Sequence, residues 1–119
     1  MAMAYRKPRI KTSSREGRQE IKDYLVSNGY NLKTNFDVLV ILEKTCATGF
    51  STKAVISRSA LEVQQSLRKG ENVVSAIASI PWEKADEMKP VQAINRLLNL
   101  CRADFFAKLK EHNKQASAK

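Results

Sequence analysis

Two groups of basic and amide side chains are the residues of this chain best suited to binding a polyanion. The first group lies near the N-terminus, and the second lies between residues 51 and 69. Arg and Lys bind phosphates, while Arg, Gln and Ser can also bond to base edges. We therefore expect nucleic acid as the ligand. The candidate residues are Arg6, Lys7, Arg9, Lys11, Arg15 and Arg18 in the first group, and Lys53, Ser57, Arg58, Gln64, Gln65, Arg68 and Lys69 in the second.

The charge balance of the whole chain favours the same class of partner. The 119 residues include 21 Lys and Arg against 12 Asp and Glu, for a net charge of +9. Residues 1–18 contain six basic side chains and one acidic one, and few apolar residues. This pattern predicts a flexible basic arm over residues 1–13 that contacts the phosphate backbone. The alternative interpretation is a tail that only increases solubility.

Composition and residue types exclude several other classes of protein. Apolar residues make up 43% of the chain and charged residues 28%, which is the composition of a folded domain. Catalysis is not expected, because the chain has no Gly-rich phosphate loop and its single histidine, His112, lies close to the C-terminus. Two separated cysteines and one histidine cannot complete a tetrahedral metal site, so neither a metal nor a cofactor is predicted.

Capping signals and apolar spacing predict an all-α fold, a compact bundle of four to five helices. Ser and Asn residues stand where helices would begin, and Gly residues stand where they would end. The single helical domain would extend over residues 14–112, with a frayed tail at 113–119. The expected helices cover about 14–28, 37–48, 51–69, 72–80 and 90–112.

Two segments of the chain also allow a strand in place of helix or loop. The run Val38–Leu42 is entirely apolar and would also fit a buried strand, although the capping pattern before it favours a helix. A short strand is also possible near residues 30–34. The rest of the chain indicates helix.

The segment 51–69 is the clearest candidate for a helix that contacts a nucleic acid. At about 100° per residue, Ile56, Ala60 and Val63 share one side of such a helix. Arg58, Gln65 and Lys69 lie on the opposite side. Such a helix could enter the major groove of duplex DNA. The alternative is an ordinary solvated face.

Residues 37–65 resemble a helix-turn-helix unit, in which a first helix supports a second that reads the major groove. Gly49 in the turn and Val55 in the second helix match that motif, whereas Thr45 replaces the small residue expected in the first helix. A ribbon-helix-helix unit is the competing resemblance. It would use residues 30–33 as the ribbon, with Asn31 and Lys33 facing the groove, and it would require a dimer.

The final segment, about residues 90–112, has a broad apolar stripe that could cover the core and also a second copy of the chain. We therefore expect a homodimer. The leading hypothesis is a small DNA-binding accessory factor of transcription or replication, of bacterial, phage or plasmid type.

Two alternatives use other partners. One is an adaptor that binds a partner enzyme through an apolar groove near Trp82 and the last helix, and the other is a binder of structured RNA. Charged residues occupy the N-terminal segment where a signal peptide would be apolar, and no apolar run approaches the ~20 residues of a membrane span. A cytoplasmic, nucleoid-associated protein is therefore expected, without membrane contact.

Overall fold

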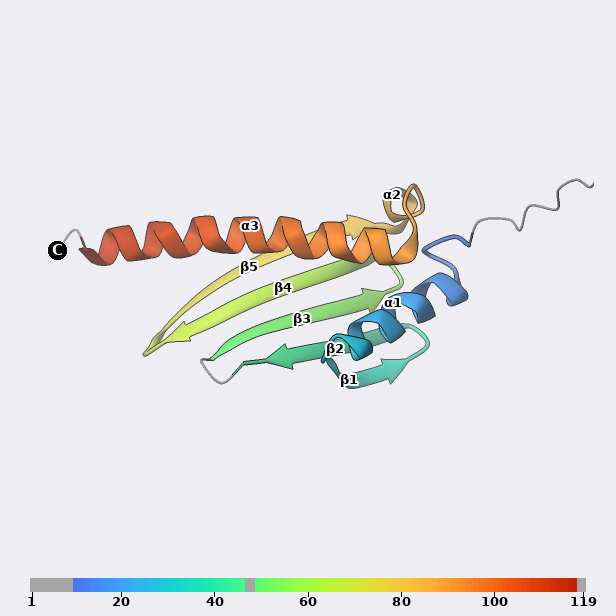
Figure 1. Cartoon of the computed structure of the whole chain (residues 1–119), viewed down its shortest axis with the longest axis horizontal. Coiled ribbons are helices and arrows are strands. Elements are labelled where there is room, and N and C mark those ends of the chain that lie inside the picture. Colours follow the sequence, from blue (N-terminus) through green and yellow to red (C-terminus); the bar gives the residue numbers. More distant parts are fainter. Residues whose placement is uncertain (1–9, 47–48, 118–119) are drawn as a thin grey trace, which may run out of the picture.

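The computed structural model describes residues 10–46 and 49–117 and shows a mixed α/β fold (Figure 1). Five antiparallel strands form one sheet in the order β1-β2-β3-β4-β5, and helices cover one of its faces. The predicted all-α bundle is therefore wrong. The elements are α1 (Arg15–Ser27), β1 (Asn31–Phe36), β2 (Leu39–Thr45), β3 (Phe50–Ser57), β4 (Ala60–Lys69), β5 (Asn72–Pro81), α2 (Trp82–Ala85) and α3 (Pro90–Ser117).

Alternating burial explains why the central segments are strands. In β3 the side chains of Thr52, Ala54 and Ile56 are buried, and their neighbours along the strand are more exposed. The register aligns Ala54 with Val63 of β4, and Val63 with Ala78 of β5. Because strand side chains alternate between faces, this register gathers apolar residues on one face of the sheet.

The predicted helix 51–69 is instead a β-hairpin, formed by β3 and β4. Ile56, Ala60 and Val63 have helical spacing, but Leu61, Val63 and Leu67 also fit the two-residue period of a strand. The turn between the strands carries no glycine signal. It is held by the hydroxyl of Ser57, which donates to the Ala60 carbonyl at 3.1 Å and accepts from the Ala60 amide at 3.3 Å. Pairing of β3 and β4 with each other and with the neighbouring strands β2 and β5 decided the secondary structure of this segment. The helix-turn-helix prediction is therefore wrong.

Two more predicted helices are strands as well. Most of the segment 37–48 forms β2, so the strand alternative for Val38–Leu42 was the better one. The segment 72–80 forms β5, in which Val74 and Ala76 are buried between exposed neighbours. The possible strand near 30–34 is confirmed as β1, but strands rather than helices follow it. The ribbon-helix-helix alternative is therefore wrong too.

The first helix and the start of the last one were predicted correctly, but the last helix continues into the segment 113–119 that was predicted to be a frayed tail. The hydroxyl of Ser14 caps α1 by accepting the amide of Gly17 at 3.0 Å. Pro90 is the first residue of α3, a position that needs no backbone amide, and the helix continues to Ser117.

The core lies between the sheet and its two long helices. Ile94, Leu97 and Phe105 of α3 are each at most 2% exposed, and Ile21 and Leu25 of α1 are fully buried. The rings of Phe105 and Phe50 meet edge to face, with centroids 5.3 Å apart. The apolar stripe of α3 therefore packs on the helix-facing side of the sheet.

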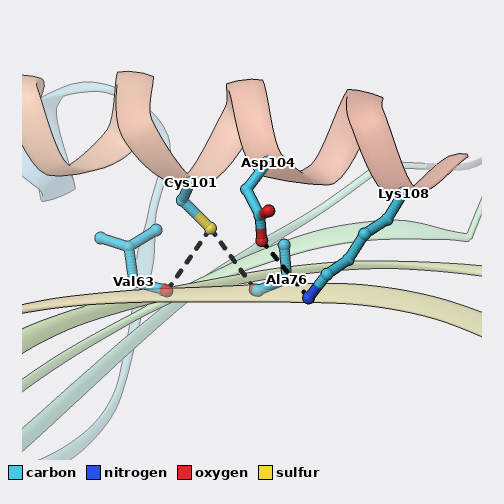
Figure 2. Close-up of polar contacts among 5 residues, drawn as sticks. All are labelled: Val63, Ala76, Cys101, Asp104 and Lys108. Atoms are coloured by element: carbon cyan, nitrogen blue, oxygen red, sulfur yellow. Dashed lines mark hydrogen bonds and ion pairs between the residues drawn. The ribbon is translucent and has the colours of Figure 1, made fainter. Parts of the chain in front are cut away.

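Cys101 lies in the middle of this packed stripe (Figure 2). Its single S–H is shared between two carbonyl oxygens, that of Val63 at 3.5 Å from the sulfur and that of Ala76 at 3.4 Å. Burial raises the pKa of the Cys101 thiol. One turn further along α3, Lys108 Nζ pairs with Asp104 Oδ2 at 3.3 Å. Cys101 therefore acts as a core residue that links α3 to β4 and β5.

The segment before α1 is attached to the loop that precedes α3. Thr12 is fully buried, and its hydroxyl donates to the Met88 carbonyl at 2.6 Å. The amide and hydroxyl of Ser13 both donate to the Asp86 carboxylate, at 2.7 and 2.8 Å. Gly17 makes this path possible, because a Cβ there would collide with the carbonyl oxygens of Lys11 and Thr12.

Phe105 and its neighbour Phe106 test the packing of α3. Phe105→Ala is expected to lower the free energy of unfolding by about 3–5 kcal/mol, since the side chain is almost fully buried. Phe106 is 51% exposed, and Phe106→Ala should cost at most about 1 kcal/mol, including its contact with Arg102. Urea denaturation followed by circular dichroism measures both. Equal losses would contradict the orientation of α3.

A substitution at Gly17 tests how closely the N-terminal segment packs against α1. Gly17→Ala is expected to lower the free energy of unfolding by about 1–3 kcal/mol, because the added methyl group would displace residues 11 and 12. The matched control is Glu20→Ala, an exposed position in the same helix, where alanine should be neutral. Thermal unfolding compares the two variants. A Gly17→Ala protein as stable as the wild type would show that the two segments do not pack this closely.

Candidate functional site

Helix α1 separates its charged residues by sign. Gly17, Ile21 and Leu25 face the core. At about 100° per residue, the basic side chains share a sector of about 60° beside this buried stripe, and the acidic ones lie on the outer side. The basic residues are Arg15, Arg18 and Lys22, and the acidic ones are Glu16, Glu20 and Asp23. The helix as a whole is neutral, so only this sorting produces a cationic face.

Two adjoining clefts run past this cationic face, with volumes of about 370 and 410 Å³. Arg18 and Asp37 line both clefts, and we call the two together the α1 groove. The first cleft is lined by Arg15, Arg18, Gln19, Lys22, Asn35, Phe36, Asp37, Val40 and Ile56. The second is lined by Ser13, Arg18, Asp37, Val38, Ser57, Arg58 and Trp82.

Hydrogen bonds between α1 and the β1–β2 hairpin hold the groove in shape. Arg18 Nη1 donates to the Asp37 carbonyl at 3.4 Å, and Lys22 Nζ donates to Asn35 Oδ1 at 3.3 Å. On the far wall, Trp82 Nε1 donates to the Ser57 carbonyl at 2.7 Å. The Nε atom of Arg18 is buried and has no hydrogen-bond partner. The groove therefore contains a guanidinium with unused bonding capacity.

The cations of the groove are not neutralised by ion pairs. The one ion pair found within residues 10–46 and 49–117 joins Lys108 and Asp104, on α3. Four basic side chains line the groove, and Asp37 is its one acidic lining residue. Because charge that is not paired remains available to a ligand, the groove can attract and hold an anion.

The structure brings four of the candidate residues to this groove. Arg15 and Arg18 come from α1, while Ser57 and Arg58 come from the turn between β3 and β4. Arg58 is exposed, and the Ser57 hydroxyl is engaged in the turn. Residues distant in the sequence thus meet at one end of the sheet.

Other candidate residues lie elsewhere. Lys53 and Gln64 face each other on the side of the sheet that carries no helix, which we call the uncovered face. Arg68, opposite Val73, also belongs to this face, near the β4–β5 turn. Lys69 is the last residue of β4 and pairs with Asn72.

Gln65 lies beneath the helices. Its side chain is 6% exposed, and Nε2 donates to Thr52 Oγ1 at 3.5 Å. Lys11 is exposed just before α1, and Arg6, Lys7 and Arg9 lie outside the described residues.

Sequence reasoning missed several residues of the groove. The omitted polar and aromatic lining residues are Ser13, Gln19, Lys22, Asn35, Phe36 and Asp37. The charge sorting around α1 could have identified Lys22, because it needs only the helical period. Nothing local could have placed the β1–β2 turn against α1, since that contact depends on how the sheet packs.

The groove has the chemistry of an anion-binding site rather than of a metal site. No cluster of three or more potential metal ligands occurs in the part of the chain that the structure describes. Burial raises the pKa of Tyr30 as well as that of Cys101, and both residues belong to the core rather than to the groove.

Within the described ranges, no helix is both long and apolar enough to cross a membrane. Comparisons of this chain with protein-family models, with curated proteins and with solved structures found no match.

Proposed function

We propose that this chain binds nucleic acid, with duplex DNA as its ligand, by holding phosphate groups in the α1 groove. The observation that carries the proposal is the set of unpaired cations on one side of α1, namely Arg15, Arg18 and Lys22. Arg58 faces the same groove from the β3–β4 turn. Contacts to phosphate supply most of the affinity of proteins that bind nucleic acid without reading sequence.

The chemistry of Arg18 favours a phosphate ligand in particular. A guanidinium presents its N–H donors in a planar fork that matches phosphate oxygens. In Arg18 one donor, Nη1, is used by the Asp37 carbonyl, and the buried Nε has no acceptor. A phosphate in the groove, which Arg18 lines, would accept from the remaining N–H groups of this guanidinium and supply a compensating charge.

A polymer of phosphates suits the groove better than one small anion does. The groove consists of two adjoining clefts, with cations in both. The net charge of the whole chain is +9, so attraction extends beyond the immediate contacts.

The uncovered face of the sheet is a weaker candidate for this contact. On that face Lys53 pairs across the strands with Glu43, and Glu62 follows in the next row. Opposite charges alternate across these strands, so this part of the face does not concentrate positive charge as the α1 groove does.

Duplex is favoured over single-stranded ligands because few aromatic rings are available for stacking. Among the described residues, Phe36 and Phe106 are the phenylalanines with large exposed surfaces, and they lie on different elements, β1 and α3. Proteins that bind single strands usually present several neighbouring rings. Competition between duplex DNA, duplex RNA and single strands tests this choice of ligand directly.

Neutralising the cationic face of α1 tests the site. The triple variant Arg15→Gln, Arg18→Gln, Lys22→Gln is expected to bind a short DNA duplex at least tenfold more weakly, and the slope of log K against log salt should decrease in magnitude by about 2–3. Fluorescence anisotropy over a salt series measures both quantities.

The matched control removes three exposed cations from α3, by Arg96→Gln, Lys110→Gln and Lys114→Gln. Its net charge equals that of the triple variant, so a purely non-specific attraction would weaken equally in both. Equal loss of affinity in the two folded variants would reject the groove as the binding site.

A second comparison uses two basic residues that were both predicted to bind, one of which lies inside the groove and one outside it. Arg58 lies in the groove, whereas Arg68 lies at the other end of β4. Arg58→Ala should weaken duplex binding several-fold and reduce the salt slope by about one, while Arg68→Ala should have little effect. If both variants bind as the wild type does, the β3–β4 turn takes no part in binding.

A further inference from the structure

The two edge strands of the sheet differ in how well they are protected from pairing with another strand. Strand β1 has six residues, an exposed lysine at position 33 and a register shift between Leu32 and Thr34. Short length, lysine and bulges are the features by which proteins block edge pairing. Strand β5 has ten residues, no charged side chain and a continuous register with β4. Its edge is therefore the unprotected one over residues 72–80, up to Pro81, which has no N–H to donate and ends the strand.

The outer edge of β5 also lacks backbone partners within the described residues. The β5 backbone bonds to β4, and the one further bond found there is from the Cys101 thiol to the Ala76 carbonyl. Val73 and Ile77 of this strand are 56% and 54% exposed. An edge of this kind can accept another strand.

The sequence of β5 is close to a palindrome, Val-Ser-Ala-Ile-Ala-Ser-Ile over residues 74–80. If two copies run antiparallel about Ile77, each residue meets one of the same kind. Ile77 opposes Ile77, Ala76 opposes Ala78, Ser75 opposes Ser79, and Val74 opposes Ile80. Directly opposed side chains are the unit that stabilises an antiparallel sheet, and this register places apolar side chains opposite apolar ones and hydroxyls opposite hydroxyls.

We propose that β5 pairs with the β5 strand of a second copy of this chain, antiparallel and centred on Ile77, so that the two sheets become one. The self-complementary sequence is what identifies the partner as a second copy rather than a different protein, because a two-fold interface requires one surface to match itself. This proposal does not depend on the proposed function.

Helix α3 is placed to extend the same interface. The Cys101 thiol reaches Ala76, next to the proposed axis (Figure 2). On one flank of the helix, Asn95 Oδ1 accepts from Tyr24 Oη at 2.8 Å, so that flank faces α1. Leu100 lies about 140° from Asn95, on the other flank, and is 55% exposed. That flank faces the β5 edge, where a second copy would cover Leu100.

Charged substitutions at Ser75 and Ser79, which are both exposed in the single chain, test which residues of the two β5 strands lie opposite each other in the dimer. In the variant Ser75→Lys, Ser79→Lys, two lysines would oppose each other twice across the interface, and the dimer should dissociate. In the variant Ser75→Lys, Ser79→Glu, each lysine would oppose a glutamate of the other copy, and the dimer should persist. Sedimentation velocity measures the mass, and circular dichroism checks that both variants fold.

Cross-linking provides a measurement that does not require dissociation. Ile77→Cys, in a Cys46→Ser background that removes the exposed native thiol, should form a covalent dimer on mild oxidation. The matched control is Asn35→Cys on β1, which should remain uncross-linked.

A wild-type chain that is monomeric at about 100 μM would overturn the proposal, since a dimer of that affinity would dissociate at cellular concentrations. A folded Lys/Lys variant that dimerises as well as the Lys/Glu variant would overturn it too. Loss of the dimer in both folded variants, without cross-linking at position 77, would reject the register centred on Ile77.

Discussion

The buried stripe of α3 packs against the helix-facing side of β4 and β5, and most other features of the molecule depend on this contact. Phe105 meets Phe50 of β3, and Cys101 bonds to both β4 and β5. An antiparallel sheet with one apolar face is not stable alone in water, because that face must be buried against another layer. Once α3 occupies this position, α1 can cover only the remaining strands, and the segment before α1 must attach to the loop that leads into α3.

This arrangement also explains where the cationic groove lies. Helix α1 rests on the sheet through Ile21 and Leu25, which turns its three basic residues toward the β1–β2 turn. The β3–β4 turn ends at the same side and contributes Arg58. The groove is thus a consequence of packing, and its charge comes from the order of residues around α1. In the proposed dimer, a two-fold axis perpendicular to the sheet would place both grooves on the same face of the assembly.

Several elements were predictable from local signals. Ser14 and Pro90 mark the starts of α1 and α3, because a cap and an N-terminal proline act locally, at the first turn of the helix.

The expected groups of basic residues proved only partly adjacent: Arg15, Arg18 and Arg58 share the groove, while Lys53 and Arg68 lie on the uncovered face. The strands were mispredicted because Ile56, Ala60 and Val63 satisfy the helical spacing, and the Ser57 turn has no glycine to announce it.

The sequence by itself determined the excess positive charge, the two helices with clear ends, and the apolar positions available for a core. It also determined the near-palindrome of β5, since that is a property of residue order alone. Only the tertiary structure decided that β2, β3, β4 and β5 form a sheet with β1, and which basic residues lie together. The physical reason is that a strand is stabilised by the strands beside it and by the helix that packs on them, here α3, which lies far away in the chain. The same local pattern can therefore be a helix or a strand until those partners are in place.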